Sequence, residues 1–175
     1  MHNYNMKNVL VAFILSFSIT AHAQEKVAAT SQFSIEGTVK NPLIVGFKEA
    51  AAYAVVSIDS LVIYNHLHER KRSLINIKGI LLKDILTKAG IDQASPKLLS
   101  EYYIICIASD GYKVVFSWNE VFNTTIGNHI IIATEAGGVK GEAMPDKMLL
   151  LSAMDTNTGR RFVKGLNKIV IERVN

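Results

Sequence analysis

Short apolar runs separated by polar turns occupy most of the chain from residue 33 onward. Phe33, Ile35 and Val39 alternate with polar residues, which is the period-two pattern of a half-buried strand. Asn41-Pro42 ends this run. Further runs that indicate strands lie at 58–65, 73–77, 102–108, 113–116, 130–133, 148–152, 162–164 and 169–174. Together they predict about seven to nine strands.

The clearest helix signal covers residues 81–89. Its apolar residues fall on one face of a helix, and Asp84 and Lys88 are spaced to pair across one turn. Gly90 follows at a position where a glycine terminates helices well. A shorter helical turn is expected over 48–53.

Two further local signals connect the predicted strands. Asp110-Gly111 separates the apolar runs 102–108 and 113–116, which predicts a tight hairpin with positive φ at both central residues. Ser117 and Glu120 have the spacing of a capping box, so a short helix is expected to begin there.

Strands dominate this order of elements, so we expect a sheet-rich α+β fold rather than a doubly wound one. At 175 residues the chain is long enough for one domain with a sizeable core and too short for two. The core should consist of inward-facing residues of the predicted strands and the main helix. We expect it to include Ile35, Ile63, Leu82, Ile85, Leu86, Ile105, Ile131, Leu150 and Ile169.

The first 23 residues have the features of a signal peptide. Lys7 precedes the apolar run 9–19, and Ala21-His22-Ala23 supplies small residues at the two positions that a signal peptidase reads. The run is short and interrupted by serines, which makes it a poor membrane span. We therefore expect cleavage before Gln24 and no stable membrane insertion afterwards.

Cleavage at this position would leave a periplasmic or secreted protein. Residues 24–32 are small and polar, so we expect a flexible lead-in to a domain over 33–174. No cysteine follows the apolar run directly, which argues against a lipid anchor. The leader also contains no Arg-Arg pair, which favours export as an unfolded chain.

The charge balance argues against a nucleic-acid partner, and the cysteine content excludes an intramolecular disulfide. Of 19 Lys and Arg and 15 Asp and Glu, the leader removes one lysine and no acid, which leaves a net charge of +3. The basic residues are scattered and not interleaved with aromatic ones, so no nucleic-acid partner is expected. Cys106 is the only cysteine, so no intramolecular disulfide forms.

Two sets of residues are candidates for metal or redox chemistry. His66 and His68 would share one face of a strand beside Glu69, and imidazoles suit zinc or copper. The alternative is a solvated hairpin tip. Cys106 lies in an apolar strand, where a lone cysteine is typically a small inert hydrophobe, with a redox or ligand role as the alternative. We expect no metal site, and no hydrolase motif occurs.

The best candidates for binding an anion are Arg161 and Lys164. We expect Arg161 and Phe162 to point to opposite faces of a strand, so that Arg161 and Lys164 together hold a phosphate or carboxylate. Arg160 belongs to the same run, and Arg70-Lys71-Arg72 has the same interpretation on weaker grounds. A solvated turn is the alternative for both runs.

Several segments together resemble a known family. They are 33–39 with Pro42, 78–86 with Ala89-Gly90-Ile91, Ala108-Ser109-Asp110-Gly111-Tyr112, 130–133 before a glycine turn, and Arg160-Arg161-Phe162-Val163-Lys164 leading into 169–171. In this order and spacing they resemble the oxidoreductase molybdopterin-binding domain, the fold of the sulfite-oxidase family, over residues 33–174.

The resemblance implies a sulfite-oxidase-type fold and an oxidoreductase that binds a molybdenum pyranopterin. In that family a cysteine thiolate between the first strands and the main helix holds the metal, whereas residues 55–78 of this chain contain no cysteine. The glycine-rich stretch that helps to contact the pterin reads Ala143-Met144-Pro145-Asp146-Lys147 here. No catalytic or metal-binding residue is therefore carried over to this chain.

The resemblance also implies that Asp110 and Tyr112 lie near the cofactor side of the fold. We expect them to line one cleft with Arg161 and Lys164, with turn chemistry as the alternative explanation for Asp110. Two classes of function follow. One is a molybdopterin-dependent oxidoreductase, and the other is a cofactor-free binding or accessory module whose cleft accepts an anionic small molecule or a pterin.

Overall fold

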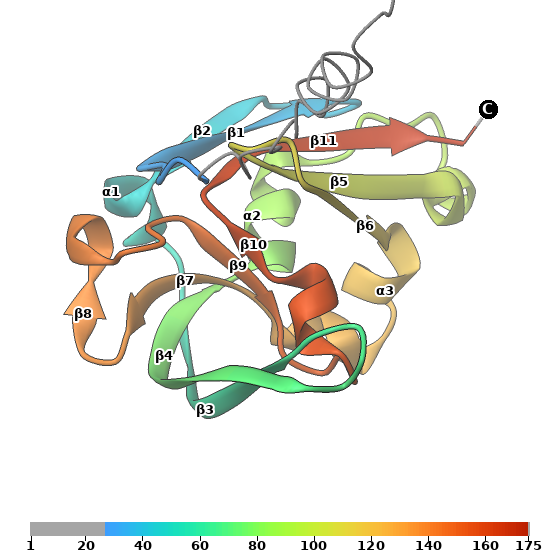
Figure 1. Cartoon of the computed structure of the whole chain (residues 1–175). Helices are drawn as coiled ribbons and strands as arrows, with labels where there is room; N and C mark the ends of the chain where they lie inside the picture. Colours follow the sequence, from blue (N-terminus) through green and yellow to red (C-terminus); the bar gives the residue numbers. More distant parts are fainter. Residues whose placement is uncertain (1–26, 175) are drawn as a thin grey trace, which may run out of the picture.

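Two β-sheets with one main helix at their junction form the part of the chain that the computed structural model describes, residues 27–174 (Figure 1). The predicted signal peptide, residues 1–23, lies outside the described residues. No helix within 27–174 is long and apolar enough to cross a membrane.

The first sheet has five strands and joins the two ends of the domain. Its order is β2 (Leu43–Gly46), β1 (Gln32–Gly37), β11 (Leu166–Arg173), β5 (Tyr102–Ala108) and β6 (Lys113–Ser117). β1 and β11 are parallel, and the other neighbours are antiparallel. The first and last strands of the domain therefore lie side by side.

The second sheet has six strands and is antiparallel throughout. Its order is β10 (Val163–Lys164), β9 (Leu149–Ser152), β7 (Ile130–Ala136), β4 (Arg70–Leu81) and β3 (Val55–Tyr64), with β8 (Val139–Lys140) paired to β7. The predicted hairpin at 58–77 is confirmed, but pairing continues to Tyr64 and Arg70, so the basic residues 70–72 belong to β4 and not to the loop.

Helices are few and short, as expected. They are α1 (Phe47–Ala50), α2 (Leu82–Ala89) and α3 (Trp118–Phe122), with the 3₁₀ turns η1 (Pro96–Glu101), η2 (Thr125–His129), η3 (Gly141–Ala143) and η4 (Thr158–Arg161). The strands in the described residues number eleven, more than the sequence indicated. The two that were not predicted are β2 and β8, which contain four and two residues and are too short for an alternating pattern to be read.

Local signals explain the helices. All the apolar residues of the predicted face of α2 are buried, and Gly90, with φ 63°, donates its N–H to the Leu86 carbonyl. The capping box of α3 is formed, since Ser117 Oγ accepts from Glu120 N and Glu120 Oε2 accepts from Ser117 N. Within the described residues, Lys88 lies over the ring of Tyr53 rather than beside Asp84.

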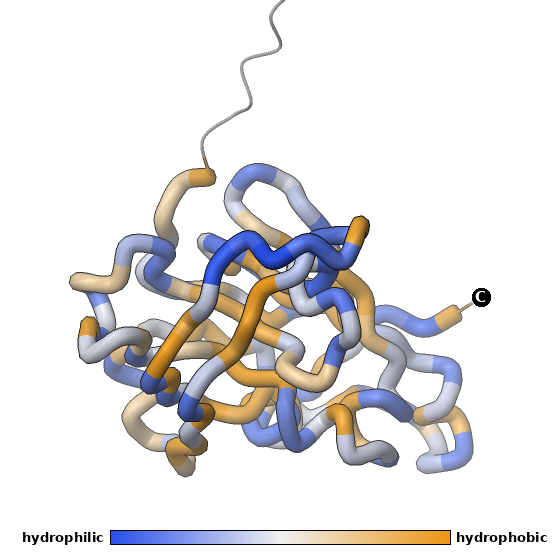
Figure 2. The backbone as a smooth tube through the Cα atoms, turned by 60° about the horizontal axis from the view of Figure 1, so that its bottom comes forward, coloured by the Kyte–Doolittle hydropathy of each residue, from blue (hydrophilic) through white to orange (hydrophobic). Residues whose placement is uncertain are grey.

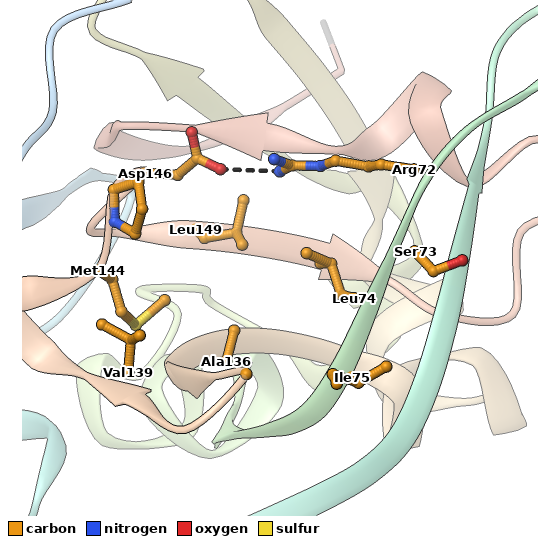
Figure 3. A pocket seen from close by; sticks show the side chains of 11 residues that line it. Arg72, Ser73, Leu74, Ile75, Ala136, Val139, Met144, Asp146 and Leu149 are labelled. Carbon is orange, nitrogen blue, oxygen red and sulfur yellow. Dashed lines mark hydrogen bonds and ion pairs between the residues drawn. The ribbon is translucent and has the colours of Figure 1, made fainter.

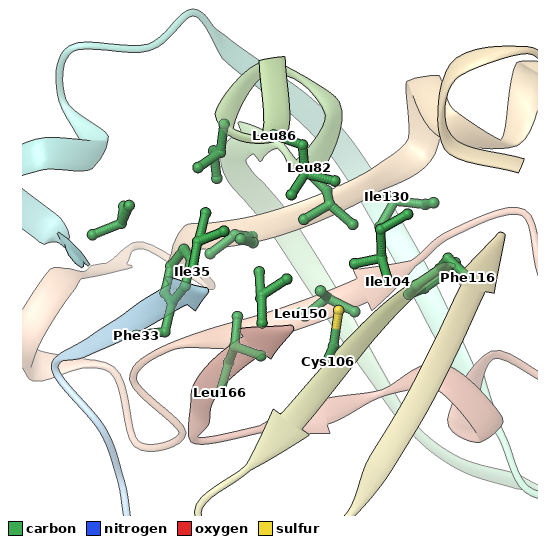
Figure 4. Packing of buried hydrophobic residues seen from close by; sticks show 14 of the residues in the cluster. Phe33, Ile35, Leu82, Leu86, Ile104, Cys106, Phe116, Ile130, Leu150 and Leu166 are labelled. Carbon is green, nitrogen blue, oxygen red and sulfur yellow. The ribbon is translucent and has the colours of Figure 1, made fainter. Parts of the chain in front are cut away.

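The main core lies between the two sheets and α2 (Figure 4). Burial alternates along the strands, as in β5, where every second residue is buried in this core. Figure 2 shows hydrophobic stretches of the backbone separated by hydrophilic ones. Of the residues predicted for the core, Ile105 is wrong: it lies half-buried on the opposite face of β5 from Ile104 and Cys106.

The β5–β6 hairpin is confirmed, but its turn differs from the one predicted. Gly111 has a positive φ of 82°, whereas Asp110 is not among the residues with positive φ. Asp110 Oδ1 instead accepts the N–H of Tyr112, 2.9 Å away. The carboxylate thus closes the turn without the strained backbone that a two-residue turn would require.

Residues 27–31, here called the N-terminal strap, are bound to the domain. Thr30 Oγ1 donates to the Leu166 carbonyl at 2.7 Å, and the Thr30 carbonyl accepts from Met148 N at 3.1 Å. Ser109 Oγ donates to the Ala28 carbonyl. Residues 27–31 belong to the lead-in expected over 24–32, and backbone groups of this part have partners in the fold.

Candidate functional site

Two adjoining pockets, the first of which is drawn in Figure 3, form a groove beside Asp146, which we call the Asp146 groove. The first has a volume of about 320 Å³ and the second about 260 Å³, and they share Pro145 and Asp146. The first is lined by Arg72, Ser73, Leu74, Ile75, Ala136, Gly137, Val139, Met144, Pro145, Asp146 and Leu149. The second is lined by Val27, Ala29, Pro145, Asp146, Lys164 and Gly165.

The floor of the first pocket is apolar. Met144 and Leu149 are buried there, and Leu74 packs against the same hydrophobic cluster. This cluster is separate from the main core and includes Leu61 and Ile63 of β3. Leu74 of β4 and Leu149 of β9 place this floor on the second sheet, and Met144 joins it from the loop before β9.

The rim of the groove is charged. Arg72 extends from β4 and donates from Nη2 to Asp146 Oδ2 at 2.8 Å (Figure 3). Lys164 Nζ of β10 lies 3.5 Å from Asp146 Oδ1. Both cations also lie over the ring of Phe162, with Arg72 Cζ 4.6 Å and Lys164 Nζ 5.9 Å from its centre. One carboxylate and one aromatic ring thus hold the two cations close to the same point.

Asp146 lies in a loop with a second ion pair. Lys147 has a φ of 42° and its Nζ lies 3.1 Å from Glu142 Oε2. Hydrogen bonds from Ser31 and Lys147 lower the pKa of Glu142 below its ordinary value. The hydrogen bond from Ser31 Oγ to Glu142 Oε2 connects this loop to the N-terminal strap, which also lines the second pocket.

This arrangement has a definite binding capacity. Asp146 accepts from one of the five N–H donors of the Arg72 guanidinium. It also lies on one side of the Lys164 ammonium group and leaves other sides open to a ligand. The two cations are therefore available to a second anion, or to an anion that displaces Asp146. An apolar floor below a basic rim suits a ligand with an anionic group and an apolar or aromatic body.

Of the four predicted ligand residues, the structure places Lys164 in the Asp146 groove. The expectation that Arg161 and Lys164 share one strand face is wrong, because Arg161 lies in η4 and Lys164 in β10. The chain leaves the 3₁₀ turn at Phe162, and the strand begins only at Val163. The strand alternation assumed for Arg161 and Phe162 therefore does not apply.

Arg161 has its own set of partners. It donates from Nε and Nη2 to Asp155 at 2.8 and 2.6 Å, and from Nη1 to Glu120 at 2.9 Å. Its Cζ lies 4.3 Å from the centre of the Phe116 ring. Hydrogen bonds from Arg161 to Asp155 outweigh burial and raise its pKa. These contacts connect η4 to the start of α3.

Glu120 responds to the same cluster. Partial burial alone would raise its pKa, but hydrogen bonds from the Ser117 backbone and from Arg161 outweigh burial and lower it. The capping-box carboxylate therefore has two tasks, because one oxygen caps α3 and the other binds Arg161.

Asp110 and Tyr112 form the tip of the β5–β6 hairpin and do not line either pocket of the groove. Tyr112 donates its hydroxyl to the Arg160 carbonyl, and Asp110 accepts from Tyr112 N. The structure thus assigns both residues to holding the hairpin and η4 together. It does not bring them into one cleft with Arg161 and Lys164.

The histidines occupy the loop between β3 and β4 rather than a strand. His68 has a φ of 58°, stacks on Tyr64 with ring centres 4.6 Å apart, and its Nδ1 lies 2.9 Å from Asn157 Oδ1. Glu69 binds Asn65 and Lys71. Within residues 27–174, no three His, Cys, Asp or Glu side chains are grouped so that they could hold a metal ion.

A thiolate-bound molybdenum centre of the kind implied by the resemblance does not fit these residues. Cys106 is the only cysteine of the chain, and it is fully buried in the main core beside Leu150 (Figure 4). Burial raises the pKa of its thiol to about 12. It lines neither pocket of the groove, so it can offer neither a thiolate nor access to a cofactor.

Sequence reasoning named Arg72 among the weaker anion-binding candidates but missed its pairing with Asp146, which is central to the groove. Arg72 and Asp146 are 74 positions apart, and neither has a local partner in the sequence pattern. The signal for Asp146 was the unusual stretch 143–147, which stands where the resemblance implies a pterin-contacting segment. Met144, Pro145 and Asp146 of that stretch do line the groove.

These features define the class of the chain: a sheet-rich α+β domain with two sheets, few helices and a charged groove on the second sheet. Among solved structures, a similar fold occurs in the sulfane dehydrogenase SoxCD of Paracoccus pantotrophus, with a TM-score of 0.51 and 14% sequence identity. The match covers 80% of this chain and 37% of the SoxCD chain, so this protein spans little more than a third of that length. The likeness is one of fold.

No protein-family model matches the sequence, and no curated protein is similar to it.

Proposed function

We propose that this protein is an exported binding module with a molybdopterin-oxidoreductase-like fold, and that its Asp146 groove binds an anionic ligand with an apolar or aromatic body. The observation that carries the proposal is the convergence of Arg72 and Lys164 on one carboxylate above an apolar floor. A basic pair held by an internal acid is suited to exchanging that acid for the anionic group of a ligand.

Pterins with a carboxylate or phosphate group belong to this ligand class. Their planar ring matches an apolar pocket of about 320 Å³, and their charged group matches the rim. The position of 143–147, where the resemblance implies a pterin contact, supports the same choice. In this proposal the ligand binds without a metal, because the chain offers no accessible thiolate.

A molybdopterin-dependent oxidoreductase is the second candidate, and the likeness to a sulfane dehydrogenase is the observation that favours it. Its weakness is the buried Cys106. Molybdenum in a one-to-one ratio in protein purified from its native host would contradict the binding-module proposal.

The proposal is tested by calorimetric titration of the mature chain with pterin-6-carboxylate, with unsubstituted pterin as the matched ligand without the anion. Arg72→Ala and Lys164→Ala should each weaken pterin-6-carboxylate binding roughly 10- to 150-fold, because a charge-assisted hydrogen bond contributes roughly 1.5–3 kcal/mol. Asp146→Asn should strengthen binding, since it removes the internal competitor. Binding should also weaken with added salt.

The matched control is Lys168→Ala, which removes a lysine paired with Glu36 outside the groove. It should leave affinity unchanged. Equal affinity of pterin and pterin-6-carboxylate, or an Asp146→Asn variant that binds less tightly than the wild type while keeping its thermal midpoint, would overturn the anion-binding role of the groove.

A further inference from the structure

β6 is an edge strand of the first sheet, and its free edge has an ordered pattern of backbone groups. Among the described residues β6 pairs with β5 alone. Ala108 N donates to the Tyr112 carbonyl, which makes Ala108 and Tyr112 a hydrogen-bonded pair. Because such pairs alternate along an antiparallel ladder, the N–H and C=O of Val115 point away from β5.

The other end of β6 agrees with this assignment. Ser117, two residues after Val115, donates its N–H to its own Glu120 side chain and not to β5. Val115 therefore has one outward donor and one outward acceptor at the middle of a five-residue edge strand. Its residue exposure of 51% places it in solvent.

The side chain of Val115 continues an apolar row across the solvent face of the first sheet. Val115 lies opposite Ile105 of β5, and Ile105 lies opposite Val170 of β11. All three alternate with core residues of their strands, so they share the outer face. An exposed edge strand that carries apolar side chains favours pairing with a strand of another chain.

We propose that two copies of this chain associate through β6, in antiparallel register centred on Val115. The twofold axis then passes between Val115 and Val115 of the second copy, which exchange two backbone hydrogen bonds. Lys113 faces Ser117 of the second copy, so no like charges meet. The two apolar rows join into one continuous row across both first sheets.

The register explains why a second copy fits this edge. Val115 is the middle residue of β6, so the strand is complementary to itself about this point. A pair of five-residue strands buries little surface, so the dimer is expected to be weak and concentration-dependent.

The test is sedimentation velocity of the mature chain from micromolar to millimolar concentration, with amide exchange measured on the same samples. The dimer fraction should rise with concentration, and exchange at Val115 should slow in parallel. Val115→Lys should weaken association about tenfold or more, because it places two like charges at the axis. Val115→Pro, which removes the outward donor, should act in the same direction.

The matched control is Ile44→Lys on β2, the opposite edge of the first sheet, where Ile44 is 63% exposed. This variant should dimerise like the wild type. A wild-type chain that stays monomeric over the whole range, or association that is lost in Ile44→Lys and kept in Val115→Lys, would overturn the proposal. Both lysine variants alter exposed positions, so near-wild-type thermal midpoints confirm that they fold.

Discussion

The Arg161 side chain joins η4 to α3, two segments that are far apart in the sequence. It binds Asp155, six residues before it, and Glu120, forty-one residues before it, while its guanidinium covers the ring of Phe116. Its side chain is 20% exposed and that of Asp155 only 12%, so these charges are largely withdrawn from water. Removing one partner would leave the others unpaired in a poorly solvated position.

Arg161→Ala should therefore lower the free energy of unfolding by about 2–4 kcal/mol at pH 7, somewhat less than the loss for a fully buried pair. The pKa of Glu120 is lowered in the folded state, so its contribution is present above its ordinary pKa of 4.5 and is lost as pH falls through the lowered value. The difference between wild type and variant should accordingly narrow below pH 4.5. Urea unfolding at neutral and acidic pH measures both effects.

Lys168→Ala is the comparison for this prediction. Lys168 and Glu36 form an exposed surface pair, so its loss should change stability by less than about 1 kcal/mol. Arg161→Ala and Lys168→Ala with the same unfolding midpoint would show that Arg161 is not structural.

At the scale of elements, the packing of β4 against β7 depends on Gly79. A Cβ at this position would overlap the Ile132 carbonyl oxygen and approach Ala133 Cα to 2.9 Å. The register of the two strands shifts between Lys78 and Gly79, so the close approach coincides with a bulge. This explains in physical terms why glycine stands in the segment 78–86 that carries the family resemblance.

Gly79→Ala should destabilise the domain by about 2–3 kcal/mol or more, because backbone atoms of β7 must move. Gly137→Ala separates backbone strain from steric overlap. No atom lies within 4 Å of a Cβ at Gly137, but the φ of this residue is 60°. The substitution should cost about 1–2 kcal/mol through backbone strain alone. Thermal unfolding of both variants tests the ranking, and a Gly79→Ala protein as stable as wild type would contradict it.

The elements that could be predicted from sequence are those with a local physical cause. The apolar face of α2, the capping box at Ser117 and the alternation in β1 each depend on neighbouring residues, and the structure confirms them. The prediction that Ile105 lies in the core was wrong because β5 is apolar on both faces, so its sequence does not show which face points inward. The prediction of positive φ at Asp110 was wrong because the Asp110 carboxylate closes the turn by accepting the N–H of Tyr112.

The groove was harder to predict, since its members meet only in the folded chain. Lys164 was found from the local run of basic residues, whereas the Arg72–Asp146 pair depends on the register of β4 with β3 and on the loop before β9. Arg161 was assigned to a ligand because its partners Glu120 and Asp155 lie outside the run that contains it.

At the scale of the whole molecule, the N-terminal strap joins segments from both sheets. Thr30 contacts Leu166 of β11 and Met148 before β9, and Ala28 contacts Ser109 after β5. The strap also lines the second pocket of the Asp146 groove through Val27 and Ala29. The start of the domain therefore contributes both to stability and to the proposed binding site.

A chain beginning at Gln32 should melt about 4–12 °C below one beginning at Gln24, because it loses two or three hydrogen bonds of roughly 1 kcal/mol each. Thr30→Val in the longer chain, which removes the bond to the Leu166 carbonyl, should show a smaller decrease in the same direction. Differential scanning calorimetry measures both. Identical midpoints for the two chains would mean that the strap does not support the fold.

The position of Cys106 makes the protein a reporter of its own opening. Because it is the sole cysteine and is shielded by the main core, a thiol-specific reagent can modify only molecules whose two sheets have separated. The rate of labelling at a fixed pH therefore measures the population of opened molecules without any engineered probe. The same measurement applies unchanged to every variant above, since none of them adds or removes a cysteine.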